Sequence, residues 1–397
     1  MLSDHALIYF GPGPWEGMWR NRHQLMSRFA RHNRVLYVQP PNYWRKSLSQ
    51  VLEKDEHRLG HLKLAGGIQQ ISNGLYVYHS PLITPLAGRW PLDALTRWLW
   101  WQTFSWALRP MNFDNPIVWI ARPEWQWIVG RLRERLTIYH VVDEYSAYQG
   151  LTPDTAEHIR QVEQQVLSRA DLVVAVSPPL VESKRAHNPH THLVANGVDA
   201  QAFSQTGAAP PADLAELPRP RILYAGLIGA RLDLEMLATV ARRRSNWSWV
   251  LLGEVNVAGV GHAMAQLQAL ANVHFLGVKP VNEVPTYLAA CDVCVLPYRR
   301  DAEANYIDPL KLYEGLAAGK PVVATPIPAV QPFMDLIRHA STADELEWQI
   351  SAATHDITVE AVARRRAAVA THTWDARVEQ LSQIVHTRLT AGSGTNV

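Results

Sequence analysis

Short apolar runs alternate with helix-like stretches along this chain, and the runs fall into two sets. The first set is ALIYF, RVLYVQP, LYVYHS, PIVWIA, LTIYHVV and DLVVAVS, and the second is RILYAG, SWVLLG, VHFLG, VCVLPY and PVVATP. Apolar runs separated by helices are typical of parallel sheets with crossover connections. The sequence therefore predicts an α/β protein with two doubly wound parallel sheets.

The length of the chain and one segment between the two sets indicate how it divides into domains. A chain of 397 residues is too long for one compact core of ordinary size. The segment SQTGAAPPADLAELPRP is rich in Pro and Ala and has little apolar periodicity. We therefore expect an N-terminal domain at 1–204, a linker at 205–220, a C-terminal domain at 221–372 and a closing segment at 373–397.

Charge and hydropathy argue against two classes of protein. The chain has 38 Lys and Arg residues against 36 Asp and Glu residues, so it lacks the broad basic field that gathers nucleic acid. No stretch offers the ~18 uncharged apolar residues of a membrane-spanning helix, and the first residues do not have the pattern of a secretory signal. We expect a cytoplasmic protein with no nucleic-acid partner and no membrane span.

The two cysteines, Cys291 and Cys294, have the spacing of a C-x-x-C pair. A redox or metal site would need further ligands, and no second pair or suitably spaced His accompanies them. Their surroundings are typical of a buried strand, in which thiols pack as small apolar groups. We interpret both as core residues, and we expect no metal and no bound cofactor.

One basic residue stands in an unusual place. In NYIDPLKLYEGLAAGKPVV, Asp308 can cap a helix, Pro309 suits its first position and Gly319 suits its end. Lys311 then lies in the first turn, where the helix dipole favours an anion by roughly 0.3 to 1 kcal/mol. The position of this cation calls for an explanation.

A phosphate at this helix N-terminus would account for Lys311. The N–H groups of Leu310 and Lys311 would point at the phosphate, and the ammonium would add a charge-assisted contact. Glu314 lies one turn further along the same face, where a carboxylate can accept both hydroxyls of a ribose. The alternative is an exposed Lys311 and Glu314 pair at i, i+3, worth ~0.2 to 0.5 kcal/mol.

Further candidate residues follow predicted strands, where open α/β sheets bind ligands. In GLIGARLD, Gly226 and Gly229 permit close backbone approach. Arg231 is a candidate phosphate ligand, or alternatively a surface partner of Asp233.

Two loops of the first half are also candidates. FGPGPWEG is either an acceptor or phosphate loop or a simple Pro-stiffened turn, and its glycines are Gly11, Gly13 and Gly17. HVVDEY presents Asp143 and Glu144 at a strand end, where a carboxylate can orient or deprotonate an acceptor hydroxyl. The alternative for Asp143 is a structural role as the cap of the following turn.

The order of motifs between residues 170 and 390 resembles the retaining GT-B glycosyltransferases of family 4. DPLKLYEGLAAGKPVVAT is similar to the donor-binding helix and strand of that family, and LVANGVDAQAF to the element after the last strand of its first domain. NVHFLGVKPVNEVPTYLAACDVCVLP resembles its nucleotide-binding stretch, and HTWDARVEQLSQIV its closing helix, which crosses back to the first domain. WRNRHQLMSRFARHNRVLYVQPP and YHVVDEYSAY resemble a branch related to teichuronic-acid and polysaccharide glycosyltransferases.

The resemblance implies a nucleotide-sugar donor site in the C-terminal domain and an acceptor side in the N-terminal domain. The donor diphosphate would lie between Arg231 and Lys311, with the ribose on Glu314. The base would lie near Gly253 and Gly277.

The chain departs from the family pattern at one position. The family usually has two glutamates with seven residues between them, the second of which matches Glu314, and the first would fall at Tyr306. Either a neighbouring carboxylate takes over the role of the first acid, or the site is impaired. The neighbouring carboxylates are Asp308, Glu303 and Asp301.

Together these motifs predict a retaining glycosyltransferase of cell-envelope or exopolysaccharide biosynthesis. It would move a sugar from a nucleotide diphosphate sugar, with UDP or GDP as the expected nucleotide, to a glycan or lipid-linked acceptor. No D-x-D element is evident, so Arg231 and Lys311 would offset the charge on the leaving diphosphate without a metal. A GT-B nucleotide-sugar epimerase and a non-catalytic GT-B partner subunit are the alternatives.

Segment 89–109, RWPLDALTRWLWWQTFSWALR, is rich in Trp and Arg. Aromatic and basic residues on one helix suit a bilayer interface, so peripheral contact with the inner face of the cell membrane is one interpretation. The other is a buried crossover helix of the first domain, because the apolar residues wrap much of the helix.

Overall fold

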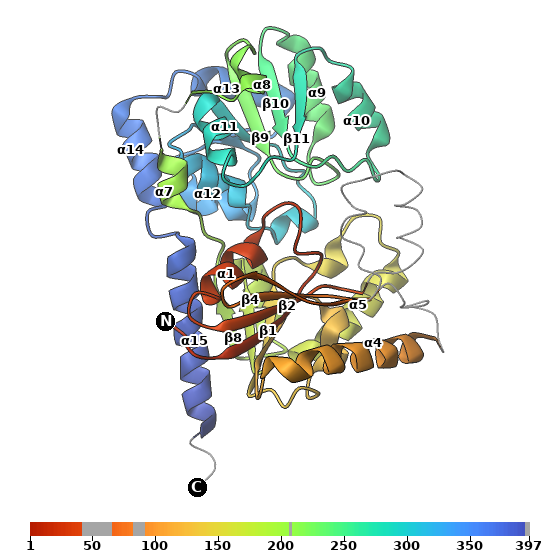
Figure 1. Ribbon diagram of the computed structural model, residues 1–397. Helices are drawn as coiled ribbons and strands as arrows, with labels where there is room; N and C mark the ends of the chain where they lie inside the picture. Colours follow the sequence, from red (N-terminus) through yellow and green to blue (C-terminus); the bar gives the residue numbers. More distant parts are fainter. Residues whose placement is uncertain (42–65, 82–91, 206–208, 394–397) are drawn as a thin grey trace.

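Two parallel sheets with helices packed against them form the framework of the protein (Figure 1). The computed structural model describes residues 1–41, 66–81, 92–205 and 209–393. The N-terminal domain contains an eight-stranded sheet and the C-terminal domain a six-stranded sheet. Both sheets are parallel throughout except for one antiparallel edge strand in the first. The predicted pair of doubly wound parallel-sheet domains is therefore confirmed.

The strand order of the N-terminal sheet runs outward in both directions from its centre. In sheet order the strands are β3 (Gly67–Ser72), β4 (Leu75–His79), β2 (Arg34–Val38), β1 (Ala6–Phe10), β5 (Ile117–Ile120), β6 (Leu136–Val141), β7 (Leu172–Ala175) and β8 (Thr191–Leu193). The register aligns Tyr9 of β1 with Tyr37 of β2 and Trp119 of β5. The two tyrosine rings stack at 5.4 Å between centroids, which fills the middle of the sheet with aromatic surface.

The C-terminal sheet repeats this arrangement with six strands. In sheet order they are β11 (Val273–Gly277), β10 (Ser248–Leu252), β9 (Arg221–Ala225), β12 (Val293–Leu296), β13 (Val322–Ala324) and β14 (Arg338–His339). The central strands are buried on both faces, as parallel strands covered by crossover helices must be.

The crossover helices alternate with these strands along the chain. The described helices of the first domain are α1 (Asn21–Phe29), α4 (Leu92–Leu108), α5 (Pro153–Leu167) and α6 (Pro178–Arg185), with the short helices η1 (Arg109–Met111), η2 (Pro123–Ile128) and η3 (Tyr145–Ala147). Those that follow are α7 (Ala200–Ser204), α8 (Ala212–Ala215), α9 (Leu234–Arg243), α10 (Gly261–Gln268), α11 (Val284–Ala290), η4 (Glu303–Asn305), α12 (Leu310–Ala317), η5 (Pro328–Phe333), α13 (Ala343–Ala353), α14 (Val359–Ala368) and α15 (Trp374–Ser393).

The last helix, α15, returns to the N-terminal domain, as expected (Figure 1). It packs beside α1, and Arg28 of α1 pairs with Asp375 at 3.2 Å. Four of its apolar side chains join the hydrophobic cluster on one face of the first sheet: Trp374, Val378, Leu381 and Val385. Helix α15 thus contributes to the hydrophobic core of the first domain.

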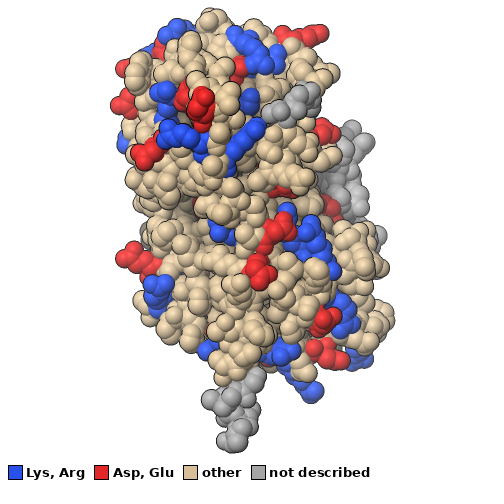
Figure 2. All heavy atoms as spheres, turned by 90° about the vertical axis from the view of Figure 1, so that its left-hand side faces the viewer, with Lys and Arg blue, Asp and Glu red and all other residues tan. Residues whose placement is uncertain are grey.

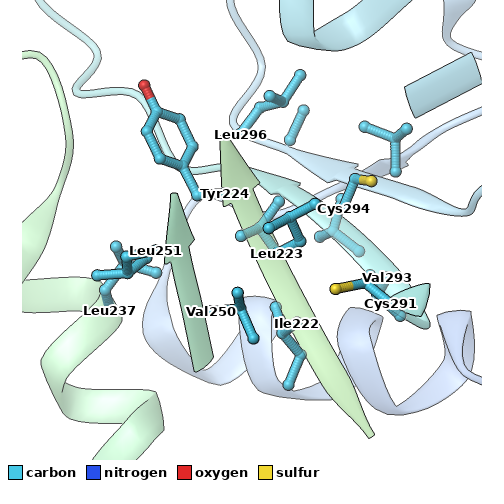
Figure 3. Close-up of a cluster of buried hydrophobic side chains, with 14 of the residues drawn as sticks. Ile222, Leu223, Tyr224, Leu237, Val250, Leu251, Cys291, Val293, Cys294 and Leu296 are labelled. Carbon is cyan, nitrogen blue, oxygen red and sulfur yellow. The ribbon is translucent and has the colours of Figure 1, made fainter. Parts of the chain in front are cut away.

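The core of the C-terminal domain surrounds β9, β10 and β12 (Figure 3). Cys291 and Cys294 lie in this cluster with side chains that are almost fully buried, and both are free thiols. Burial raises the pKa of Cys294 to about 12, so the thiol stays protonated. The cysteines are therefore core residues.

The sequence analysis placed the start of the linker at residue 205. Residues before this point already pack against the second domain. Val198 and Phe203 belong to the hydrophobic cluster of the C-terminal domain, and so does Leu214 of α8. In α8, Asp213 accepts hydrogen bonds from Lys279 at 2.7 Å and from the Tyr287 hydroxyl at 2.8 Å. The described part of the segment 205–220 is thus anchored to the second domain.

Helix α4 carries the Trp-rich segment, and one of its faces is buried, as the crossover-helix interpretation predicts. Trp100 and Phe104 are buried against the first sheet, as in a crossover helix. Trp98 and Trp106 on another face are 56% and 72% exposed. The helix lies on the part of the N-terminal domain that faces away from the C-terminal domain (Figure 1). Arg89 and Trp90, the first residues of the segment, lie outside the described residues.

Positive and negative side chains are interspersed on the molecular face that carries α14 and α15 (Figure 2). None of the described helices combines the length and the apolar run needed to cross a bilayer.

Candidate active site

The strand order reverses once in each sheet, and loops from these regions of the two domains meet. The reversal lies between β1 and β5 in the first sheet and between β9 and β12 in the second. Open α/β sheets bind ligands outside the carboxyl ends of their strands at such a point. Gln149, which follows β6, donates a hydrogen bond of 2.6 Å to Asp301 of the loop after β12. The candidate site is built from the loops after β1, β6, β9 and β12.

Two glycines bring the loops after β9 and β10 into contact with each other. Gly253 has φ +142°, and a Cβ there would overlap the Gly226 carbonyl group. A Cβ on Gly226 would lie 2.6 Å from Cε of Lys311. Gly253 is therefore required for close backbone approach, and Gly226 leaves the space that the end of the lysine side chain occupies.

The other two predicted glycines of the donor site differ from each other. A Cβ on Gly229 would lie 3.0 Å from the Asn256 carbonyl oxygen, so this glycine serves loop packing. Gly277 has φ +70°, and a Cβ there would meet nothing within 4 Å. Its carbonyl accepts a hydrogen bond from the Gly253 N–H at 2.8 Å. Gly277 thus borders open space at the end of β11.

Helix α12 begins without a side-chain cap. Its first residue is Leu310, and Pro309 occupies the cap position in an extended conformation. Asp308 instead accepts hydrogen bonds from the Asn196 N–H at 2.6 Å and from the Tyr313 hydroxyl at 2.8 Å. The expectation that Asp308 caps this helix is wrong, because other donors engage its carboxylate. Among the residues that the structure describes, no side chain satisfies the first-turn N–H groups of α12, which therefore suit an anion.

Lys311 and Glu314 are half-buried on α12. Within the described part of the chain neither makes an ion pair or a side-chain hydrogen bond, so the alternative of an exposed i, i+3 pair is not observed. Burial lowers the pKa of Lys311, Glu314 opposes this, and the nearby cations Arg20 and Arg231 lower it further. Burial raises the pKa of Glu314. Two charged groups are thus held near each other without direct partners.

Arg231 joins the two domains through carboxylates. Its guanidinium pairs with Asp143 of the first domain at 3.0 Å and with Glu303 of the second at 2.5 Å, and it lies over the Tyr148 ring. Burial disfavours the charge of Arg231, but Asp143 and Glu303 raise its pKa above the usual value. The alternative pairing with Asp233 does not occur, since that carboxylate caps α9. Asp143, in turn, faces the interdomain site.

Glu144 is buried away from the site, contrary to its prediction as a catalytic residue. Its carboxylate lies 2.5 Å from the ammonium of Lys184, which also pairs with Glu163 at 2.8 Å. The Tyr139 hydroxyl donates to Glu163 at 2.7 Å and completes the network. Glu144 therefore cannot act on an acceptor. It holds the loop that presents Asp143.

The loop after β1 matches the Pro-stiffened turn more closely than a phosphate cradle. A Cβ on Gly11 would collide with the Tyr37 ring, so glycine is needed there for packing. The carbonyl of Gly13 accepts a hydrogen bond from the Tyr37 hydroxyl at 2.6 Å. Gly17 has φ +94° and faces open space, where a turn requires it.

Tyr306 stands where the family usually has its first glutamate. One carboxylate near it, Glu303, is linked to the N-terminal domain through Arg231. Tyr306 packs against the cluster on one face of the first sheet, and its carbonyl accepts from Ser177 at 2.7 Å. Asp301 is occupied by Gln149 and by the Ala304 N–H. Of the three neighbouring carboxylates considered, Glu303 is the one bound to Arg231.

Arg20 was missed by the sequence analysis. It directly precedes α1 and, in the described structure, makes no ion pair. Arg20 is an exposed residue. Partial desolvation and the cations Arg22 and Arg231 lower its pKa, whereas the carboxylates Asp143 and Glu254 oppose the shift. Its position ten residues after β1 gives no sequence signal, because a loop of that length can place a side chain in many directions.

A separate cavity of about 510 Å³ adjoins these loops, and its lining includes Leu232, His262 and Arg300. Asp301 of the loop after β12 also lines it, whereas Lys311 and Glu314 do not, so the cavity borders the candidate site on the side away from α12. The described residues contain no group of three or more His, Cys, Asp or Glu side chains placed to hold a metal ion.

Part of the chain is similar in sequence to a known family and to a known bacterial protein. Residues 219–364 match the family described as glycosyl transferases group 1. The chain is also 32% identical over 176 residues to the putative teichuronic acid biosynthesis glycosyltransferase TuaH of Bacillus subtilis (strain 168). That match covers 43% of this chain and 44% of the relative, less than half of its length. The resemblance to the family and to this branch is confirmed.

Solved structures share the whole architecture. Sucrose-phosphate synthase from Thermosynechococcus elongatus superposes with a TM-score of 0.68 at 18% identity, covering 98% of this chain and 100% of the other. HepE from Anabaena, solved with UDP and glucose, gives 0.65 at 16% identity, covering 96% and 99%. Both likenesses concern the fold, and they confirm the GT-B arrangement of two facing Rossmann-like domains.

Proposed function

We propose that this protein, whose residues 219–364 match the group 1 glycosyl transferases, moves a sugar from a nucleotide diphosphate sugar to a glycan or lipid-linked acceptor with retention of configuration. One observation carries the proposal. Lys311 is half-buried without an ion-pair partner among the described residues, at an uncapped helix N-terminus and near Arg231. That combination of donors and cations suits a diphosphate. The name of the Bacillus relative supports a place in cell-envelope polysaccharide synthesis.

The donor would lie along the carboxyl ends of the C-terminal strands. Its diphosphate would contact Lys311 and the first-turn N–H groups of α12, with the ribose hydroxyls on Glu314 one turn away. The open space beside Gly277 is where the base would lie. HepE binds UDP according to the description of its structure, which makes UDP the first nucleotide to test.

The cations at the site would stabilise the leaving group. As the sugar departs, negative charge builds on the diphosphate, and positive groups fixed in place before the reaction lower the energy of that state. Arg231 is at present held by Asp143 and Glu303, so a diphosphate would replace one of these carboxylates or approach the open side of the guanidinium. Because cations supply the compensation, we expect no requirement for a metal.

Two carboxylates are left to act near the transferred sugar. We propose that Glu303 takes over the role of the acid missing at Tyr306, because it is the neighbouring carboxylate that is bound to Arg231. Asp143 lies across the site on the acceptor side, where it would orient or deprotonate the acceptor hydroxyl. Glu144 would support this by fixing the loop of Asp143.

We also propose a peripheral contact of α4 with the inner face of the cell membrane. Trp98 and Trp106 are exposed, and Leu95 on the same side is 48% exposed. Arg109 at the end of the helix is exposed as well. An aromatic and basic face suits a headgroup region that carries anionic lipid.

Flotation with liposomes tests the membrane contact. The protein should float with anionic vesicles at low salt and be released as ionic strength rises, because charge attraction is screened within ~10 Å at 0.1 M salt. Replacing Trp98 and Trp106 by Ser should abolish flotation, whereas Trp348→Ser, at another exposed tryptophan, should not. A protein that stays in solution with every vesicle composition would refute this contact.

A donor screen tests the main proposal. Thermal shift with UDP-, GDP- and ADP-sugars should identify at least one ligand, and hydrolysis of that donor should follow with and without EDTA. Binding with hydrolysis that survives EDTA would support a metal-independent glycosyltransferase. Binding without any turnover, even with candidate acceptors, would favour the non-catalytic partner subunit. Formation of an epimeric nucleotide sugar would favour the epimerase, and no binding at all would refute the donor site.

A further inference from the structure

The loop that leads from β1 to α1 is fixed before any ligand binds. Arg22 donates a hydrogen bond to the Pro14 carbonyl at 2.8 Å, and the indole N–H of Trp125 donates to the Gly11 carbonyl at 3.1 Å. The buried ring of His23 lies 2.7 Å from the Trp15 carbonyl oxygen. Side chains from outside the loop therefore hold its backbone at several points, so the residue at its end has a defined position.

The end of this loop lies against the start of α12. The Asn21 amide donates to the Asn196 side chain at 2.5 Å. Asn196 in turn donates to Asp308 through its backbone N–H at 2.6 Å and through its amide, which reaches the Asp308 carbonyl at 2.7 Å. Arg20 precedes Asn21 in the sequence, and Lys311 follows Asp308 by three residues, so both lie next to this hydrogen-bond network. Two helix N-termini from different domains thus meet at the candidate site.

Three cations converge at this meeting point. The charge of Arg231 acts on Arg20, and the charges of both arginines act on Lys311, while Asp143 and Glu254 act on Arg20 in the opposite sense. Only Arg231 forms ion pairs with described residues. Carboxylates also lie near these cations, since Asp143 and Glu303 pair with Arg231 and Glu314 acts on Lys311. Arg20 and Lys311 form no ion pair with a described residue, so both ammonium and guanidinium can contact an anion bound between them.

We propose that Arg20 binds the diphosphate of the donor from the N-terminal side, opposite Lys311 and Arg231. The inference rests on the proposed function and adds a contact from the other domain. Lys311 and Arg231 both belong to the donor domain, which favours the donor diphosphate over a phosphate carried by the acceptor. Both domains would then contact the diphosphate of a bound donor. A nucleoside without phosphate would not make these contacts.

Calorimetric titration with UDP and GDP tests the role of Arg20. The variants are Arg20→Ala and Arg20→Lys. The control is Arg31→Ala, which removes an exposed arginine of the same domain whose partner is Asp375. We expect Arg20→Ala to weaken diphosphate binding by at least about tenfold, since one charge-assisted contact is lost. Arg20→Lys should restore part of the affinity, the control should bind as the wild type does, and affinity for the free nucleoside should stay unchanged.

The outcomes separate this inference from the proposed function. If Lys311→Ala weakens diphosphate binding and Arg20→Ala does not, the donor site stands and the role of Arg20 is refuted. If Arg20→Ala changes only the KM of the acceptor, Arg20 binds an acceptor phosphate and the inference is equally refuted. If the wild-type protein binds neither UDP nor GDP, both proposals fail. A melting temperature of Arg20→Ala equal to that of the wild type excludes misfolding as the cause of weaker binding.

Discussion

Two regions of the molecule each surround a lysine with charge, and they do so in opposite ways. In the N-terminal domain, Lys184 is buried between Glu144 and Glu163, with both distances at or below 2.8 Å. In the C-terminal domain, Lys311 is half-buried with Glu314 nearby and makes no ion pair with a described residue. The first cation is over-compensated by carboxylates and the second is left without a direct partner.

This is the difference that we expect between a cation with a structural role and a cation that binds a ligand. Removing a charge from water costs several kcal/mol unless a partner restores the interaction, so a protein folds around Lys184 only because the two glutamates are there. At Lys311, the described residues offset only part of the free energy that it costs to remove the ammonium group from water. An unpaired cation is therefore expected where a ligand supplies the missing anion.

The largest effect is expected from breaking the compensated network. Lys184→Met leaves Glu144 and Glu163 buried without their cation, which should lower the free energy of unfolding by about 3 to 5 kcal/mol. Denaturant unfolding monitored by tryptophan fluorescence measures this loss. Adding Glu163→Gln to the same variant should recover part of it, because one buried negative charge is removed. A loss below about 1 kcal/mol would show that the network is not structural.

Asp308 offers an intermediate case, in which two hydrogen bonds and the charge of Arg377 partly compensate a buried carboxylate. Burial raises the pKa of Asp308 to about 6, although Asn196 and Tyr313 oppose the shift. Between about pH 4 and 6 the folded state then binds more protons than the unfolded state. The contribution of this group to stability is therefore present at low pH and is lost as pH rises towards 6.

Asp308→Asn removes this titration. We expect the free energy of unfolding of the variant to fall less steeply than that of the wild type between pH 4 and 6, by about 1 to 3 kcal/mol across the window. Unfolding curves at several pH values measure it. Asp213→Asn, at a carboxylate whose pKa is lowered by Lys279 and Tyr287 despite burial, serves as the control. Parallel pH profiles of wild type and Asp308→Asn would contradict the assignment.

Removing the uncompensated lysine should affect ligand binding and leave the fold intact. Lys311→Met should weaken binding of the donor nucleotide by about 1.5 to 3 kcal/mol, because one charge-assisted contact to phosphate is lost. Its unfolding free energy should equal or slightly exceed that of the wild type, in contrast to Lys184→Met. Calorimetry and denaturant unfolding on the same preparation test both statements. Normal donor affinity in this variant would return Lys311 to a structural role.

The smallest effect is expected at Glu314. In Glu314→Gln an amide can accept hydrogen bonds through one oxygen only, so recognition of two ribose hydroxyls should weaken by about 1 kcal/mol. Affinities for UDP and for a 2′,3′-dideoxy analogue measure the change. The variant should lose affinity for UDP and not for the analogue. Equal losses for the two ligands would argue against a ribose contact.

The sequence was informative about the fold wherever strands are buried on both faces. The runs ALIYF and RILYA coincide with β1 and β9, because continuous apolar runs mark strands covered by helices. β3, β8 and β14 were not anticipated. Four residues of β3 are exposed, and β8 and β14 have only three and two residues, so none of them leaves an apolar run.

The candidate site was predictable where one residue was locally out of place. Lys311 could be singled out because a cation in the first helical turn is unfavourable. Glu144 was assigned wrongly because its partner Lys184 lies 40 residues further along the chain. Arg20 was missed for the same kind of reason, since its position depends on contacts of Asn21 with Asn196, 175 residues away. Pairings between distant residues leave no pattern in a local stretch of sequence.

The packing of α15 has a consequence for how the protein is made on the ribosome. Synthesis proceeds from the N-terminus, and domains generally fold as they emerge. The first sheet, however, buries one of its faces against Trp374 and Val378, which are translated after the whole second domain. Until then, the nascent first domain exposes apolar surface that is later covered. Chaperone binding to ribosome-bound chains should therefore persist until α15 has left the exit tunnel.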